Sequence, residues 1–155
     1  MADEASTFKV EDAQIIFRNF EGKETQYNRK GDRNFSVVLP PDVAIQMLED
    51  GWNVKFSEPR EDGDEGTYHI QVAVSYKNRP PRVVLITSGG RTQLNEDAIE
   101  VLDFADIQTA DLIARGYNWV VGDKSGTKAY LQTLFVTIRE DDLERKYKIH
   151  EDPPS

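Results

Sequence analysis

The sequence predicts a mainly β fold, a small antiparallel barrel elaborated by two or three short helices. Three observations predict this class: apolar residues alternate along many short segments, turn-forming residues separate those segments, and few stretches have helical periodicity. The chain has 155 residues, of which 38% are apolar, which suits one compact domain with a real core. We expect this domain to cover residues 1–149, followed by a flexible C-terminal tail over residues 150–155.

The clearest strand pattern covers residues 67–77. Its apolar parity consists of Tyr68, Ile70, Val72, Val74 and Tyr76, and the other parity is mostly polar. This alternation is typical of a half-buried antiparallel strand. Less regular strand patterns cover residues 8–20, 34–39, 52–56, 82–88, 110–121 and 128–138, so we expect about seven strands. The segment 122–126 contains Gly122 and Gly126 and should close a hairpin between the last two strands.

Helical patterns occur in three places. Residues 41–51 open with proline and aspartate and end at glycine, which is typical of a short helix. Asn95 is a suitable N-cap for a helix over residues 96–104, with Ile99, Leu102 and Phe104 turned toward the core. Residues 140–148 begin with acids and end with bases, as expected of a final helix.

This number of strands, with a helix inserted between early strands, fits an elaborated five-stranded barrel of the oligonucleotide-binding (OB) type. The strand pattern alone fits other small barrels as well. We therefore expect an OB-like domain.

The charge is unevenly distributed along the chain. The formal net charge is -9, yet residues 67–94 contain four basic and no acidic side chains, and residues 16–39 contain five basic and three acidic ones. The acids gather in residues 58–66 and 95–107. The basic segments also contain aromatic residues, which favours a local binding surface for an anionic partner.

Several functions are disfavoured by composition. The absence of cysteine excludes a disulfide scaffold, a thiolate zinc site and a cysteine nucleophile, and it fits a cytoplasmic protein. No apolar run is long enough to span a membrane, so we expect no membrane partner. The two histidines, His69 and His150, do not form a metal cluster, and the acidic run 61–65 lacks the ligand spacing of a calcium loop. We expect no enzyme, no metal and no cofactor.

The strongest candidate site combines cations with aromatic rings, as binding of an unpaired nucleic-acid strand requires. Phe17, Phe35 and Trp52 are expected in the core, whereas Trp119 fits burial and stacking equally well. The residues expected to contact phosphates are Arg18, Lys23, Arg29, Lys30, Arg33, Lys77, Arg79, Arg82 and Arg91. The residues expected to stack on bases are Phe20, Tyr27, Tyr76 and Trp119.

Several stretches also resemble a known family. These are IIFRNFEGKETQYNRKGDRNFSVVL, DGWNVKF, QVAVSYKNRPPRVVLITSGG, LDFADIQTADLIARGYNWVV and KAYLQTLFVTIREDDLERKY. Together they resemble bacteriophage single-stranded DNA-binding proteins over about residues 8–147. The resemblance implies an OB barrel that coats single-stranded DNA in the host cytoplasm during phage replication and recombination. Phage replication or recombination proteins are further candidate partners. Many such binders recruit them through an acidic tail closed by phenylalanine, and this chain departs from that pattern because it ends IHEDPPS.

Two other classes remain as alternatives. An acidic protein-interaction module could imitate nucleic acid and bind a host or phage enzyme, although it would leave the basic segments unexplained. A carboxylate-dependent nuclease would need clustered acids at defined strand positions, which the sequence does not offer. The leading hypothesis is therefore sequence-tolerant, non-catalytic binding of single-stranded DNA.

Overall fold

The computed structural model describes residues 7–58, 66–77 and 79–139. The elements in chain order are β1 (Thr7–Ala13), β2 (Ile15–Asn19), β3 (Arg33–Leu39), α1 (Pro41–Glu49), β4 (Val54–Ser57), β5 (Thr67–Val74), β6 (Arg82–Thr87), β7 (Gly90–Leu94), the 3-10 helix η1 (Ile99–Asp103), β8 (Ile107–Val121) and β9 (Lys124–Ile138). The acidic run 61–65, the expected helix 140–148 and the tail 150–155 lie outside the described residues.

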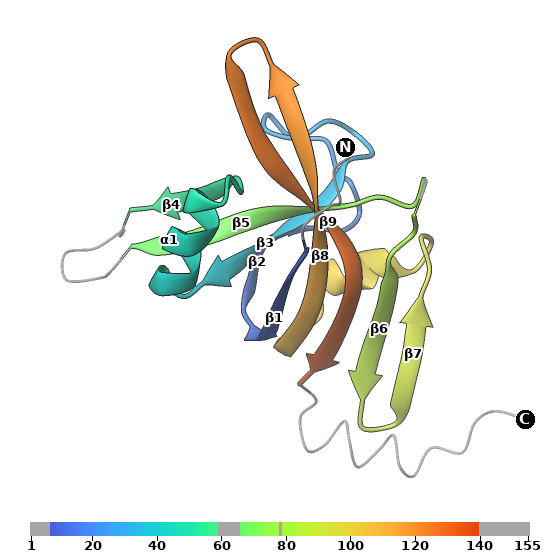
Figure 1. Ribbon diagram of the computed structural model, residues 1–155. Helices are drawn as coiled ribbons and strands as arrows, with labels where there is room; N and C mark the ends of the chain where they lie inside the picture. The colour runs from blue at the N-terminus through green and yellow to red at the C-terminus, as the bar shows by residue number, and fades with distance from the viewer. Residues whose placement is uncertain (1–6, 59–65, 78, 140–155) are drawn as a thin grey trace, which may run out of the picture.

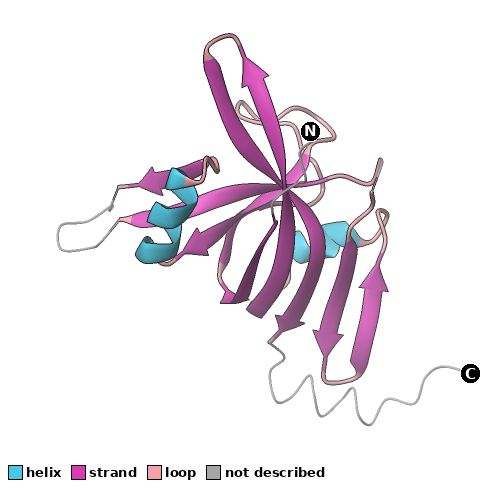
Figure 2. Cartoon of the chain, viewed as in Figure 1, coloured by secondary structure: helices cyan, strands magenta, loops and turns pink. Residues whose placement is uncertain are grey.

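The described strands form one mixed sheet (Figures 1 and 2). Its main path runs β1-β8-β9-β5-β3-β2, while β4 pairs with β5, and β6 pairs with β9 and β7. The expectation of a mainly β protein is confirmed. The expectation of a wholly antiparallel barrel is wrong, because β9 runs parallel to both β5 and β6. The long connection from β5 to β9 brings the two strands into the same direction, which a tight hairpin could not do.

The two ends of the main path are neighbours in the chain. Only Gln14 separates β1 from β2, and its carbonyl oxygen accepts a hydrogen bond from the Val38 amide of β3 at 3.0 Å. The sheet therefore bends back on itself through the backbone, although within the described residues no ladder of hydrogen bonds joins β1 to β2. This curvature separates an inner, apolar face from an outer face.

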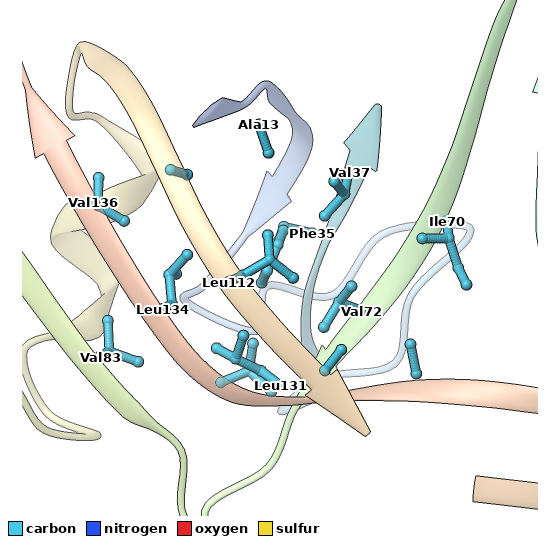
Figure 3. Packing of buried hydrophobic residues seen from close by; sticks show 14 of the residues in the cluster. Ala13, Phe35, Val37, Ile70, Val72, Val83, Leu112, Leu131, Leu134 and Val136 are labelled. Carbon is cyan, nitrogen blue, oxygen red and sulfur yellow. The ribbon is translucent and has the colours of Figure 1, made fainter. Parts of the chain in front are cut away.

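The core lies on the inner face of the curved sheet (Figure 3). Phe35 and Val37 of β3 pack with Ile70 and Val72 of β5, and all four side chains are fully buried. From the other side β8 and β9 contribute apolar residues such as Leu112, Leu131, Leu134 and Val136. Trp52 is also buried, as expected, and its ring meets Phe8 edge-on at 5.0 Å.

Helix α1 matches its prediction, with Ala44 and Met47 buried against the sheet. The second expected helix is instead a turn followed by η1, whose N-cap is Ala98 and not Asn95. Oδ1 of Asn95 closes the turn by accepting a bond from the Ala98 amide at 3.0 Å. Ile99 and Leu102 are buried, but the expectation that Phe104 is buried is wrong, because it is 82% exposed. With three residues per turn, Ile99 and Leu102 share one side and Phe104 faces away from it.

Strands β8 and β9 form a hairpin longer than the sheet it belongs to. It projects beyond the other strands, at the top of Figure 1. The turn consists of Gly122 and Asp123, and Gly122 has a φ of 61°, which glycine adopts without steric cost. This confirms the predicted hairpin. Strand β7 was not predicted, because four of its five side chains are exposed and it shows no apolar alternation.

Candidate nucleic-acid interface

A cleft of about 490 Å³ opens on the outer face of the sheet, beside the loop that joins β2 to β3. We call it the aromatic cleft, because Phe17, Tyr27 and Phe104 are exposed at its walls. The other lining residues are Arg18, Asn19, Glu21, Lys23, Thr25, Asn28, Asn34, Gln71 and Asp103. Loop, strand and 3-10 helix residues far apart in the sequence thus meet at one surface.

A bulge in β2 decides which phenylalanine reaches the cleft. Ile16 pairs with Ser36 and Asn19 pairs with Asn34, so two residues of β2 oppose only Phe35. The extra residue shifts the alternation of side chains. Phe17 therefore turns outward and is 60% exposed, whereas Phe20 is 0% exposed and stacks on Phe35 at 5.1 Å. Both expectations for this pair are wrong: Phe17 is not a core residue, and the buried Phe20 does not present a face to a base.

Arg18 and Asp103 join the end of β2 to η1. Nη1 of Arg18 donates to the carbonyl oxygens of Leu102 at 2.8 Å and Ala105 at 2.7 Å. In return the Asp103 carboxylate accepts hydrogen bonds from the backbone amides of Phe20 at 2.7 Å and Glu21 at 2.9 Å. This reciprocal clamp fixes two walls of the cleft relative to each other. Arg18 thus has a structural partner in addition to the phosphate contact expected of it.

The loop between β2 and β3 is ordered by its own hydrogen bonds. Nδ2 of Asn28 donates to the carbonyl oxygens of Lys23 at 3.0 Å and Asp32 at 2.9 Å, and the Gly31 amide donates to Gly22 at 2.8 Å. At the tip of this loop Tyr27 is 89% exposed, which confirms that it is a surface residue. A ring presented by a hydrogen-bonded loop loses less conformational freedom on binding than one on a loose segment.

The register of the sheet connects the aromatic cleft to the β8–β9 hairpin. Asn34 pairs with Ala73, Ala73 with Tyr130, and Tyr130 with Arg115. Directly paired residues point to the same side of a sheet, so these four side chains form a row across β3, β5, β9 and β8. Asn34 lines the cleft, whereas the residues that alternate with this row along the same strands are buried in the core. The row therefore lies on the outer face and spans roughly 15 Å at the usual spacing between strands.

Beyond this row, the same face of the hairpin carries aromatic and basic side chains. Tyr117 is 60% exposed and meets Tyr130 edge-on at 6.2 Å, and the Lys128 ammonium lies 5.2 Å from the centre of the Tyr130 ring. Lys124 follows on the same parity of β9. We call the set Arg115, Tyr117, Lys124, Lys128 and Tyr130 the hairpin face.

The cations at the two ends of this surface differ in their partners. In the loop and at the start of β3, Lys23 lies 3.8 Å from Glu21, Arg29 3.5 Å from Asp32, and Arg33 3.1 Å from Glu96. By contrast, the part of the chain that the structure describes offers no carboxylate within 4.0 Å of Arg115, Lys124 or Lys128. A cation without an ion-pair partner can attract an anion without first losing another contact, and in this respect the hairpin face differs from the loop.

The remaining expected phosphate contacts are distributed around this surface. Lys30 and Lys77 are exposed. The carbonyl oxygen of Arg79 accepts a bond from Arg115 at 3.3 Å, which places the β5–β6 connection beside the hairpin face. Arg82 lies over the Phe135 ring at 5.5 Å, on the outer face of β6 and β9. Arg91 pairs with Ile86 near the far end of the β6–β7 hairpin, so it is separated from the others.

Two of the expected stacking residues are held by the protein itself. Tyr76 packs against the core, and burial raises the pKa of its hydroxyl. Its ring is therefore not a free platform for a base, contrary to expectation. Trp119 is half-buried and pairs with Gly126, where an added Cβ would approach the indole ring to 2.9 Å. The absence of a side chain at Gly126 allows this close approach, so Trp119 has protein contacts on one side and partial exposure on the other.

His69 forms part of the outer face beside Phe17. Its Nε2 lies 2.8 Å from Oγ of Ser57, its ring meets Phe17 edge-on at 5.4 Å, and its buried Nδ1 has no hydrogen-bond partner among the described residues. Burial and, to a lesser degree, the positive charge of Lys55 lower the pKa of His69 below 6.5. The imidazole is therefore neutral at neutral pH.

This lowered pKa predicts how stability depends on pH. Above pH 6.5 the side chain is neutral in both the folded and the unfolded chain, but as the pH falls below 6.5 the unfolded chain takes up the proton first. We expect the free energy of unfolding to decrease over that window and to level off below the folded-state pKa. Thermal unfolding between pH 7.5 and pH 5.5 measures the effect. The His69→Gln variant is the control, and an identical decrease in both proteins would exclude His69 as its source.

Sequence reasoning missed seven side chains that the structure places on this surface: Phe17, Phe104 and the five of the hairpin face. The exposure of Phe17 and Phe104 results from the bulge in β2 and from the 3-10 geometry of η1, and no sequence pattern indicates either feature. Arg115, Lys124 and Lys128 could have been found, because residues 112–130 contain three cations, three aromatics and a single acid. They were missed because the pairing of β5 with β9, which joins the hairpin to the cleft, is visible only in the fold.

In residues 7–58, 66–77 and 79–139 no group of three or more histidine, aspartate or glutamate side chains could hold a metal ion. No helix in the same part of the chain is long and apolar enough to cross a membrane.

Solved structures of phage single-stranded DNA-binding proteins resemble this fold. The single-stranded DNA-binding protein of bacteriophage Enc34 is similar with a TM-score of 0.53 and 13% identity, over 87% of this chain and 82% of that chain. A structure of the Enc34 protein in complex with single-stranded DNA gives a TM-score of 0.52 and 14% identity, over 88% and 87%. The protein gp2.5 of bacteriophage T7 has a TM-score of 0.44 at 10% identity, over 98% and 99%. At these identities the first two matches show the shared fold, which is OB-like.

The family follows from the sequence. A family model described as a phage ssDNA-binding domain matches residues 3–152, so the chain belongs to the phage single-stranded DNA-binding family. This confirms the resemblance, and because the family is non-catalytic it also confirms that the chain is not an enzyme. No curated protein matches the chain significantly.

Proposed function

We propose that this chain binds single-stranded DNA without regard to sequence, along a track from the aromatic cleft to the hairpin face. It would do so during phage DNA replication and recombination, in the host cytoplasm. The observation that carries the proposal is the row Asn34–Ala73–Tyr130–Arg115, which joins exposed rings at one end to unpaired cations at the other. Membership of the phage single-stranded DNA-binding family and the fold shared with the Enc34 protein support it.

The two ends of the track supply different parts of the binding energy. Cations of the hairpin face neutralise phosphates and release counterions, which gives affinity that does not depend on the bases. Exposed rings of the aromatic cleft stack on unpaired bases, and every base has a face on which a ring can stack. A duplex keeps its bases stacked internally, so it can use only the first contribution. Preference for single strands thus depends on the aromatic cleft, whereas the hairpin face supplies affinity for either form.

A titration with oligo-dT, poly-dA and duplex DNA at several salt concentrations tests the function. If Lys23, Arg115, Lys124 and Lys128 each neutralise one phosphate, log K should fall with log salt with a slope of about -3 for a single strand. Oligo-dT and poly-dA should bind alike, and the duplex much more weakly. A slope near zero, or absence of binding as expected of an acidic protein-interaction module, would contradict the proposal. Equal affinity for duplex would indicate simple charge attraction.

Tyr27 offers a separate test of stacking in the cleft. Replacing it by alanine should cost about 1 to 3 kcal/mol of binding free energy, whereas Tyr27→Phe should cost little, because stacking needs the ring and not the hydroxyl. Since the side chain is exposed, the melting temperature should hardly change in either variant. Fluorescence titration with oligo-dT measures the first effect and thermal unfolding the second. Unchanged affinity of Tyr27→Ala would remove this ring from the track.

A further inference from the structure

Two phenylalanines are largely exposed at the aromatic cleft. Phe17 is 60% and Phe104 is 82% exposed, and neither side chain has a polar atom that water could hydrate. Single exposed apolar residues are ordinary on protein surfaces, but two phenylalanines lining one cleft with Tyr27 form a patch, which is typical of a binding site.

The backbone holds Phe17 outward in an unfavourable conformation. Its φ is 52°, in the left-handed region that side chains other than glycine, asparagine and aspartate rarely adopt. Glycine would adopt this conformation freely, yet the position carries a large ring. Strained residues of this kind persist where the surrounding structure determines them, and they cluster at ligand-binding sites.

The surroundings of both rings are ordered. The edge of the His69 ring supports Phe17 at 5.4 Å, and His69 is itself buried and held by Ser57. The clamp between Arg18 and Asp103 ties the strand that carries Phe17 to the 3-10 helix that precedes Phe104. Both walls of the cleft are thus positioned before any ligand arrives, which lowers the entropic cost of binding.

We propose that Phe17 and Phe104 form a pocket that takes one unpaired nucleobase, with Phe17 as the preorganised stacking platform. Gln71, an exposed residue of β5 on the same face as Asn34 and Ala73, also lines this cleft. This proposal deepens the proposed function and rests on it, since it names the part of the nucleic acid that the cleft receives.

The decisive experiment compares a strand that has bases with one that has none. The Phe17→Gly variant removes the ring and also relieves the left-handed backbone strain, so it should fold at least as well as the parent protein. Its affinity for oligo-dT should fall about 5- to 150-fold, the usual loss for one stacked base. Its affinity for an abasic phosphodiester oligomer of equal length should not change, because that oligomer has phosphates but no base. Phe104→Ser should show the same selective loss.

Phe56 supplies a matched control, because it is 51% exposed and packs against Tyr68 on β5, outside the lining of the cleft. Phe56→Ala should bind both oligomers like the parent protein. Equal loss for oligo-dT and the abasic oligomer in Phe17→Gly would overturn the pocket, as would full affinity for oligo-dT. If Phe17→Gly binds oligo-dT with full affinity and a normal salt slope, the pocket is overturned but the proposed function stands. Absence of oligo-dT binding by the parent protein would overturn both.

Discussion

Replacing Lys124 and Lys128 together by glutamine is expected to weaken binding of single-stranded DNA on the order of 100-fold at low salt. Each lysine is exposed, and no described carboxylate lies within ion-pair distance of its ammonium group. A charge-assisted contact contributes about 1.5 to 3 kcal/mol, and 1.4 kcal/mol corresponds to a factor of ten. The slope of log K against log salt should become flatter by about 1.4, since each phosphate contact on a single strand accounts for about 0.7.

A control variant separates local contacts from net charge. Lys9→Gln combined with Arg139→Gln removes the same amount of charge from β1 and from the residue after β9, both away from the hairpin tip. We expect this variant to retain most of its affinity and its salt slope. Equal losses in the two double variants would indicate that only the overall charge matters, and the hairpin face would then have no special role.

The cations of the loop and those of the hairpin face are expected to contribute unequally to the binding free energy. Arg29 differs from Lys124 in having an ion-pair partner, because its guanidinium lies 3.5 Å from the Asp32 carboxylate. Moving from Asp32 to a phosphate exchanges one ionic partner for another, so we expect the loop cations to contribute less than those of the hairpin face. Sequence alone could not make this distinction, because counting charges along a segment does not show which of them are paired in space.

The parts of the fold that depend on local patterns could be predicted from the sequence. The alternation along residues 67–77 predicted β5, and proline and glycine marked both ends of α1. The glycine pair around residues 122–126 predicted the hairpin. In each case a short stretch of chain contains the physical cause, such as the period of the side chains or the conformational freedom of glycine.

The features that position the candidate site depend on long-range pairing instead. One extra residue in β2 exchanges the environments of Phe17 and Phe20, and an apolar parity read along residues 8–20 cannot show where the exchange occurs. A similar irregularity in β9 leaves Gln132 unpaired and buries both Leu131 and Leu134. A bulge depends on the register with a partner strand, which the local sequence does not show. The kinds of residue at the site could therefore be predicted, but the orientation of its aromatic rings could not.

Phe20→Ala is expected to destabilise the protein by about 3 to 5 kcal/mol, the usual cost of removing a buried phenylalanine ring. The ring is fully buried and stacks on Phe35, so its removal leaves a cavity beneath the bulge of β2. For a domain of this size the melting temperature should fall by roughly 10 °C or more. Thermal unfolding measures the effect directly, and Phe17→Ala, which removes an exposed ring, should show little change.

Phe20→Leu distinguishes a core residue from a stacking residue. Leucine preserves most of the buried apolar volume, so the loss of stability should be small, about 1.5 kcal/mol or less. It has no aromatic face, so a base that stacked on Phe20 would lose that contact. Because the ring is sealed from solvent, we expect oligo-dT to bind the folded variant as tightly as the parent protein. A stable Phe20→Leu protein with tenfold weaker binding would show that DNA reaches Phe20, and that the bulge of β2 rearranges when the strand binds.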